Sequence, residues 1–170
     1  MKIIPVRKED LPKLQEISRQ TFYDTFAEVN TAEDMQHYLD VNLSEMQLLK
    51  EWKNPQTAFY FACQEEEILG YLKLNEGEAQ TESRKETSLE IERIYVRSSH
   101  QRRGIGQFLL DQAIQIAKAK GLKLIWLGVW EHNLSAIRFY ERNGFEFFGK
   151  HVFMLGTDEQ TDLLLERKLD

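Results

Sequence analysis

The chain has 170 residues, long enough for one domain that buries a core without disulfides or metal ions, so a single domain over residues 1–170 is expected. Its composition, 42% hydrophobic and 29% charged with three prolines and nine glycines, is typical of a soluble globular protein and excludes a disordered or fibrous one. The net charge of −6 argues against a general nucleic-acid binder, because binding to phosphates needs clustered lysine and arginine. A cationic partner suits this charge, and so does solubility alone.

The same sequence limits the compartment and the kinds of site. Cys63 is the only cysteine, so no intramolecular disulfide can form and nothing calls for an oxidising compartment. Residues 1–10 carry charges and a proline where a signal peptide needs an apolar core, and no apolar run approaches membrane-spanning length. His132 and His151 lack partners at metal-ligand spacing, so no metal site is expected. We therefore expect a cytoplasmic protein without a membrane partner, either a monomer or a homodimer.

The first half of the chain predicts three helices and a hairpin. Apolar residues recur at helical spacing over Glu9–Gln20. A second helix is predicted over Ala32–Leu39, capped by the Thr31 hydroxyl, and a third over Glu45–Trp52. The predicted strands of this half are Lys2–Val6 and the antiparallel pair Thr57–Gln64 and Ile68–Leu74. The segment Asn75–Thr87 is polar throughout, which predicts an exposed loop.

The segment Ser88–Val96, "SLEIERIYV", predicts a central strand. Strict alternation would place Leu89, Ile91, Arg93 and Tyr95 on one face and Glu90, Glu92, Ile94 and Val96 on the other. Both faces are then mixed, since Arg93 and Ile94 break the amphipathic pattern. We expect such a strand in the middle of a sheet, with one face on a core and part of the other face in a cleft.

The second half predicts a strand, loop, helix and strand of the length that a right-handed parallel crossover needs. The helix covers Gly104–Lys120, with Gly121 suited to the left-handed cap, and the second strand covers Leu124–Val129. The remaining predicted elements are a helix at Ser135–Asn143 and strands at Phe145–Phe148 and Asp162–Lys168. This order of elements predicts an α/β (α+β) fold, with a mixed central sheet of about six or seven strands flanked by helices.

The stretch His100–Gln107, "HQRRGIGQ", is locally basic in an acidic chain and opens the helix. A glycine loop at a helix start presents unpaired backbone N–H groups at the positive end of the helix, and these attract phosphate. Gly104 and Gly106 let the backbone approach such an anion closely. A purely structural turn explains a lone Gly-x-Gly equally well. Leu109 stands where a dinucleotide-binding loop needs its third glycine, and the Gly-Lys-Ser/Thr ending of a nucleoside-triphosphate loop is absent.

Three motifs in order carry a resemblance to a known family. The loop Gln101-Arg102-Arg103-Gly104-Ile105-Gly106 follows "IERIYV" and precedes "NLSAIRFYERNGF". Together they resemble the Gcn5-related N-acetyltransferase (GNAT) superfamily over Ser88–Gly149, and Ser98 departs from it where many members have a proline. The stretches "TFYDTF", "IWLGVWEHN" and "EQTDLLL" are similar to the PaiA-type spermidine/spermine N-acetyltransferases.

The resemblance implies the GNAT fold, acetyl-CoA as cosubstrate and a role for each matching residue. The strand residues Ile94, Tyr95 and Val96 would pair their backbone with the pantetheine arm like an added strand. The pyrophosphate would be held, mainly by backbone amides, in the stretch Gln101, Arg102, Arg103, Gly104, Ile105, Gly106 and Gln107. Asn133 would contact the cofactor by its side-chain amide, with Ser135 and Ala136 close by. Tyr140 would lie near the CoA sulfur.

Acetylating an alkyl ammonium at neutral pH needs a base, because its pKa is about 10.4 and only the free amine attacks a thioester. Glu92 is the candidate, since it is expected on the cleft face beside the cofactor-pairing residues, where burial would raise its pKa toward the useful range. The alternative is that Glu92 pairs with Arg93 or with another surface cation. Tyr140 would protonate the departing thiolate, whereas without the motif an aromatic residue at this helical spacing usually belongs to the core.

The acidic surplus and the PaiA-type resemblance predict a polyamine such as spermidine or spermine as the acetyl acceptor. The carboxylates expected to attract it are Asp24, Glu28, Glu33 and Asp34, and the aromatic residues expected to line it are Phe22, Tyr23 and Phe26. The alternative is that the acids are solvated and the aromatic residues are core. Two other functions stay open: acetylation of a protein N-terminus or lysine, and a regulator that binds CoA or a partner without turnover.

Overall fold

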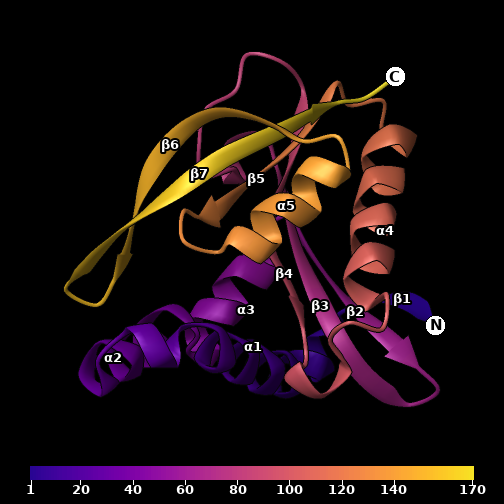
Figure 1. Cartoon of the computed structure of the whole chain (residues 1–170). Coiled ribbons are helices and arrows are strands. Elements are labelled where there is room, and N and C mark those ends of the chain that lie inside the picture. Colours follow the sequence, from indigo (N-terminus) through magenta and orange to yellow (C-terminus); the bar gives the residue numbers. More distant parts are fainter.

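A seven-stranded mixed sheet runs through the computed structural model, which describes all 170 residues (Figure 1). Its strands lie in the order β1-β2-β3-β4-β5-β7-β6, and only β4 and β5 pair in parallel. The strands are β1 (Lys2–Pro5), β2 (Thr57–Gln64), β3 (Glu67–Glu76), β4 (Ser88–Val96), β5 (Leu124–Trp130), β6 (Glu146–Leu155) and β7 (Asp158–Lys168). The mixed α/β architecture predicted from the sequence is confirmed.

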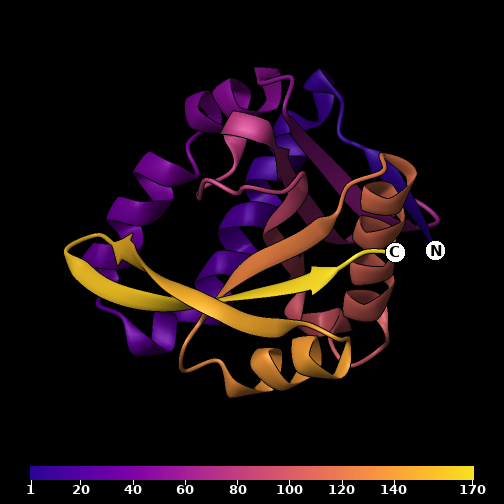
Figure 2. The same cartoon turned by 90° about the horizontal axis from the view of Figure 1, so that it is seen from above.

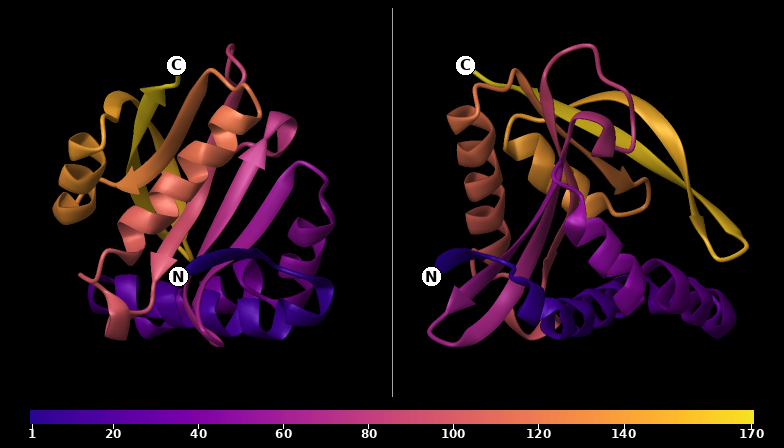
Figure 3. Two further views of the ribbon diagram at one scale, coloured as in Figure 1. Left: turned by 90° about the vertical axis from the view of Figure 1, so that its right-hand side faces the viewer. Right: turned by 180° about the vertical axis from the view of Figure 1, so that it is seen from behind.

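Five α-helices cover the two faces of the sheet (Figure 2). They are α1 (Leu11–Phe26), α2 (Ala32–Asn42), α3 (Glu45–Lys53), α4 (Ile105–Ala119) and α5 (Leu134–Arg142). Helices α1 to α3 pack on one face and α4 and α5 on the other, as the side views show (Figure 3). Each face has its own close-packed apolar core, which fixes the positions of the strand ends. No helix is both long enough and apolar enough to cross a membrane.

Most predicted elements are confirmed within a few residues. The β2–β3 hairpin, strand β4 and the crossover from β4 through α4 to β5 are present. The caps are confirmed too, since the Thr31 hydroxyl accepts a hydrogen bond from the Asp34 amide at 3.1 Å and Gly121 has a φ of +70°. The largest differences are α1, which continues to Phe26, and β6, which continues to Leu155. Tertiary contacts hold both extensions, because Phe26 is buried and β6 pairs with β7 along its length.

The predicted faces of β4 are confirmed as far as Glu92 and are wrong from Arg93 on, because a β-bulge interrupts the pairing of β4 with β3. Arg93 lies opposite Lys73. The next pair is Ile91 opposite Leu74, which leaves Glu92 as an extra residue. The α4 core is contacted by Leu89, Ile91, Ile94 and Val96, and the other face holds Glu90, Glu92, Arg93 and Tyr95. The break in the sequence pattern is therefore the bulge, which reverses the alternation.

The prediction of an exposed loop over residues 75–87 is wrong in part, because this segment packs on the sheet. The indole N–H of Trp126 donates a hydrogen bond to Gln80 Oε1 at 2.8 Å. The Thr81 amide and hydroxyl donate to the Glu90 carboxylate at 2.9 and 2.5 Å. Polar composition in this loop reflects buried polar partners as well as solvent, and composition alone does not distinguish the two.

Strands β4 and β5 separate at their carboxyl ends. They pair only over Ser88–Ile91 and Leu124–Leu127, after which β5 continues alongside β7. Beyond Ile91, one edge of β4 has no strand partner, while its other edge pairs with β3. Open α/β sheets bind ligands in a crevice at the carboxyl ends of parallel strands. This gap is the centre of the candidate site.

Candidate functional site

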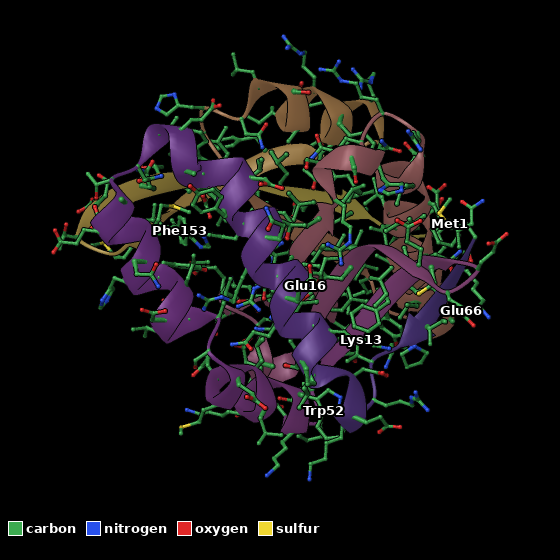
Figure 4. The ribbon with its side chains drawn as sticks, turned by 90° about the horizontal axis from the view of Figure 1, so that it is seen from below. Met1, Lys13, Glu16, Trp52, Glu66 and Phe153 are labelled. Carbon is green, nitrogen blue, oxygen red and sulfur yellow. The ribbon has the colours of Figure 1, made fainter.

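A cleft of about 630 Å³ occupies the gap between β4 and β5. One end, called the loop end, is lined by Gln101, Arg102, Gly104, Gly106, Gln107, Asn133, Ser135 and Ala136. The other end, called the helix end, is lined by aromatic and charged side chains, Phe22, Phe26, Tyr38, Glu90, Glu92, Arg93, Trp130, His151, Phe153 and Asp162. Seen from below, Phe153 lies beside α1 and α2 (Figure 4). The cleft thus joins a polar loop to a wall of aromatic rings and charged side chains, three of them carboxylates.

The loop end is built from backbone. Gly104 is the N-cap of α4 with a φ of +82°, and Arg102 before it also has a positive φ, +63°. No side chain caps α4, so the first amides of this helix have no intrahelical partner. A Cβ added at Gly104 or Gly106 would meet no atom within 4 Å, so open space adjoins the loop. Unpaired amides at the positive end of a helix, next to open space, fit a phosphate group.

The unpaired edge of β4 runs along the middle of the cleft. Ile94, Tyr95 and Val96 line the cleft and belong to the segment that pairs with β3 on its other edge. In an antiparallel pair, alternate residues direct their N–H and C=O groups away from the partner strand, here into the gap. An extended ligand can bind such groups as an added strand does. The geometry fits a long ligand whose anionic part lies at the loop end.

The structure brings most of the predicted cofactor residues to the cleft, with two exceptions. Ile105 is 4% exposed and belongs to the core under α4. Arg103 lines a separate hollow beside the acidic turn of the β2–β3 hairpin. Asn133 lines the cleft, but its Oδ1 accepts a hydrogen bond from the Ala136 amide as the cap of α5. That bond leaves its side-chain NH₂ group for a ligand.

Tyr140 is both a core residue and a cleft residue. It is 7% exposed in α5, packs against Phe139 and Phe145, and lines the cleft. Burial raises the pKa of its phenol well above the ordinary tyrosine value. The hydroxyl is therefore protonated at neutral pH and can donate a proton or a hydrogen bond to a group in the cleft.

Glu92 belongs to a buried group of charges on the α3 side of the sheet. Its Oε2 lies 2.5 Å from Lys73 Nζ and 2.7 Å from Asn75 Nδ2. Lys73 Nζ also lies 2.5 Å from Glu51 Oε1 of α3. Burial acts to raise the pKa of Glu92, but the charges of Arg93 and Lys73 outweigh it, so this pKa is lowered and the expected rise is wrong. The alternative prediction is that Glu92 pairs with a cation on the surface. Glu92 does pair with a cation, Lys73, but this residue is buried.

Two further carboxylates, Glu90 and Asp162, line the cleft, and no sequence motif marks either of them. Glu90 is 3% exposed. Burial raises its pKa, although the hydrogen bonds that Thr81 donates act to lower it. Asp162 Oδ2 lies 3.3 Å from His151 Nε2, and the other ring nitrogen of His151 lies 2.8 Å from Glu82 Oε1. The hydrogen bond with Asp162 raises the pKa of His151 above its ordinary value.

The carboxylates predicted to attract the substrate do not line the cleft. Asp24, Glu28 and Glu33 are exposed and lie outside the lining. Asp34 Oδ1 accepts two hydrogen bonds at 3.0 Å, from the amide and the hydroxyl of Thr157 at the tip of the β6–β7 hairpin. Asp24 follows the buried Ile17 by two turns of α1, but it is exposed and accepts a hydrogen bond from the Gln20 side chain at 2.8 Å. The acids of the helix end come from strands instead.

The predicted aromatic residues are divided between the cleft and the surface. Phe22 and Phe26 lie one helical turn apart and line the helix end, whereas Tyr23 is 51% exposed and lies outside the lining. Phe22 stacks on Tyr38 with ring centroids 4.1 Å apart. The ring centroids of Phe26 and Phe153 lie 6.2 Å apart. These rings are core and cleft wall at once.

One of the missed residues carried a signal in the sequence. Lys73 is a cation inside an otherwise apolar strand, "ILGYLKL", and a buried charge of this kind needs a partner. Asp162 and His151 carried no local signal. They lie opposite each other in the β6–β7 ladder, so only the pairing of those strands brings them together.

The chain is similar to known acetyltransferases. The acetyltransferase (GNAT) family model matches residues 13–145. A protein of Lactobacillus delbrueckii subsp. lactis, named as an uncharacterized N-acetyltransferase in the pepI 3′ region, is 44% identical over 169 residues, which cover 99% of this chain and 98% of that protein. A spermidine N(1)-acetyltransferase of Thermoplasma acidophilum is 25% identical over 174 residues, which cover 98% of each chain.

A solved structure shares the architecture. The crystal structure of PaiA N-acetyltransferase from Thermoplasma acidophilum in complex with coenzyme A has a TM-score of 0.77 and 24% identity, covering 99% of this chain and 100% of that chain. At this identity the likeness shows the fold alone. The mixed sheet with helices on both faces is therefore the fold of that acetyltransferase.

Proposed function

Because the chain belongs to the GNAT family of N-acetyltransferases, whose acetyl donor is acetyl-CoA, we propose that it acetylates a primary amine of a linear polyamine such as spermidine or spermine. The observation that carries the proposal is the helix end, where Glu90, Glu92 and Asp162 share one cleft with aromatic walls. Carboxylates attract ammonium groups, and aromatic rings pack on methylene segments and bind ammonium through cation–π contacts. Similarity to a spermidine acetyltransferase along nearly the whole chain points the same way.

The donor is proposed to lie along the edge of β4 with its pyrophosphate at the loop end. Backbone groups of Ile94–Val96 bind the pantetheine arm, and amides of Arg102–Gln107 bind the pyrophosphate. The open space at Gly104 and Gly106 supports this placement, because the loop leaves room for an anion. The free NH₂ group of Asn133 is proposed to bind the donor from the start of α5.

Glu92 and Tyr140 are proposed to carry the two proton transfers. Since its pKa is lowered, Glu92 is ionised at neutral pH and attracts the acceptor ammonium before accepting a proton from it, directly or through a water. The free amine attacks the acetyl carbonyl carbon, so a C–N bond forms and the C–S bond breaks. The attacking nitrogen loses its second proton to solvent as the amide forms. Tyr140 gives its proton to the departing CoA thiolate and regains one from solvent, while Glu92 releases its proton to solvent, so one proton is released for each ammonium acetylated.

The tip of the β6–β7 hairpin favours a small linear acceptor over a folded protein. Thr157 is bound to Asp34 of α2, and Phe153 packs against Tyr38 at 5.8 Å. A Cβ at Gly156 would collide with Asp34, so this close approach requires glycine. These contacts join the hairpin to α2 beside the helix end, and a bare methylene chain is proposed to pass beside this bridge more easily than a polypeptide with side chains.

A panel of acceptors with acetyl-CoA, read by release of free thiol, tests the proposal. The panel contains spermine, spermidine, a neutral-tailed monoamine of similar length, a lysine peptide and a peptide with a free N-terminus. We expect spermine and spermidine to exceed the monoamine in kcat/KM by about tenfold or more, the effect of one further favourable ion pair. Turnover of the peptides alone, or CoA binding with no turnover, overturns the polyamine assignment in favour of a protein acetyltransferase or a regulator respectively.

A further inference from the structure

Lys73 is a cationic side chain buried at the centre of the sheet. It is 5% exposed, lies between Leu72 and Leu74 in β3, and its Nζ stands 5.9 Å from the centroid of the Phe59 ring. A charge in such surroundings is strongly destabilising unless it is paired, so its partners indicate its role. Both partners are carboxylates, and one of them is Glu92, which lines the cleft.

We propose that Lys73 is a positioning residue for Glu92: anchored by Glu51 of α3, it holds the Glu92 carboxylate in one orientation and keeps it ionised while the acceptor ammonium is near. The inference rests on the proposed role of Glu92 as the proton acceptor. Lys73 itself does not line the cleft, so it acts through Glu92 rather than on a reactant.

The β-bulge explains why Glu92 needs such a partner. A bulged residue has no partner in the ladder, so pairing does not fix where its side chain points. Lys73 and Asn75 lie on the same face of β3, two residues apart, and both contact Glu92 Oε2, at 2.5 and 2.7 Å. Glu92 Oε1 has no hydrogen-bond partner within the protein, which leaves it for the proton of an amine.

The surrounding charges set the direction in which Glu92 changes when Lys73 is removed. The titratable groups that face this cluster are Tyr38 of α2, Glu51 of α3, Tyr71 and Lys73 of β3, and Glu90 and Arg93 of β4. Lys73 and Arg93 balance the charges of Glu51 and Glu92, and Arg93 Nη1 lies 3.2 Å from Glu51. Without Lys73 one buried negative charge is in excess, so protonation of Glu92 becomes easier.

The test is the pH dependence of kcat/KM for spermidine in a Lys73→Met variant, which keeps most of the side-chain length and removes the charge. In the parent enzyme Glu92 is ionised throughout the range from about pH 6 to about pH 8.5, so the profile follows deprotonation of the amine alone. In Lys73→Met, Glu92 takes up a proton within that range. Relative to the parent at the same pH, we expect the kcat/KM of Lys73→Met to fall about tenfold more near pH 6 than near pH 8.5, since one pKa unit corresponds to a factor of ten.

Two control variants separate positioning from a structural effect. The double variant Lys73→Met/Glu92→Gln is expected to have the pH profile of Glu92→Gln alone, because no carboxylate remains at position 92 to titrate. Arg84→Met removes a cation of similar burial that pairs with Glu166 and does not line the cleft. Arg84→Met is expected to lower Tm about as much as Lys73→Met does, and to keep the pH profile of the parent.

The outcomes distinguish this inference from the proposed function. A Glu92→Gln variant as fast as the parent removes Glu92 from the mechanism, and the inference with it. If Glu92→Gln is slow but Lys73→Met keeps the parent profile, the inference alone is overturned. A shift that persists in the double variant overturns it as well. If Lys73→Met does not fold, Lys73→Gln, which keeps hydrogen-bond donors and loses the charge, must show the same shift.

Discussion

The two ends of the cleft are built in different ways. The loop end consists largely of consecutive residues whose backbone amides and glycines form the site. The helix end consists of side chains from six elements, α1, α2, β4, β5, β6 and β7. A site of the first kind is specified by a local motif and suits a donor that a whole family shares. A site of the second kind depends on the tertiary fold and suits an acceptor that differs between relatives.

The largest expected effect concerns Tyr140, which belongs to neither end. Tyr140→Phe removes the proton donor for the thiolate, so we expect kcat to fall by about a hundredfold or more while the Kd of CoA is unchanged. Thiol release measures the first and calorimetry the second. Tyr23→Phe, at an exposed position outside the cleft, is the matched control. Equal kcat values for the two variants would remove Tyr140 from the chemistry.

The next effect breaks the loop end. Gly104→Val places a β-branched side chain at a φ of +82° and fills the space beside the amides, so the Kd of CoA should rise by about a hundredfold. Gly121→Val is the control, because Gly121 also has a positive φ and open space around its Cβ but lies at the other end of α4. The loop assignment is contradicted if calorimetry finds the same CoA affinity in both variants.

A smaller effect breaks the helix end alone. Asp162→Asn removes one cleft carboxylate, so kcat/KM for spermine should fall by about tenfold while the Kd of CoA stays the same. The paired change Asp24→Asn/Glu28→Gln neutralises exposed acids outside the cleft and should have little effect at physiological ionic strength, where attraction is screened over about 8 Å. If Asp24→Asn/Glu28→Gln lowers kcat/KM for spermine more than Asp162→Asn does, the polyamine binds at the surface of α1 and not at the helix end.

The smallest effect is on stability and depends on pH. The folded protein raises the pKa of His151, mainly through Asp162, so His151 binds its proton more tightly in the folded state than in the unfolded state. This stabilisation is complete below the unfolded pKa of about 6.5 and is lost as pH rises through the higher folded value. The loss of Tm in His151→Asn should therefore be larger near pH 6 than near pH 8.5, by scanning calorimetry. A larger loss of Tm near pH 8.5 than near pH 6 would contradict a raised pKa of His151 in the folded protein.

The same contrast explains what the sequence predicts. Gly104, Gly106 and the helix after them are adjacent in the chain, so their pattern predicts both the crossover and the anion site. The faces of β4 are mispredicted from Arg93 on because the bulge at Glu92 depends on how β4 pairs with β3. The acids of the cleft are mispredicted because Asp162 and Glu90 reach it only through the sheet. Strand register, which periodicity alone does not give, separates the successes from the errors.

The central claim is that the helix end selects a polyamine while the loop end holds acetyl-CoA. The most direct measurement is the ratio of kcat/KM for spermidine to that for a neutral-tailed monoamine of similar length, in the parent and in Glu90→Gln/Asp162→Asn. We expect a ratio of about ten or more in the parent that falls towards one in the variant, with the Kd of CoA unchanged. Turnover of both amines by the parent with a ratio near one would contradict it.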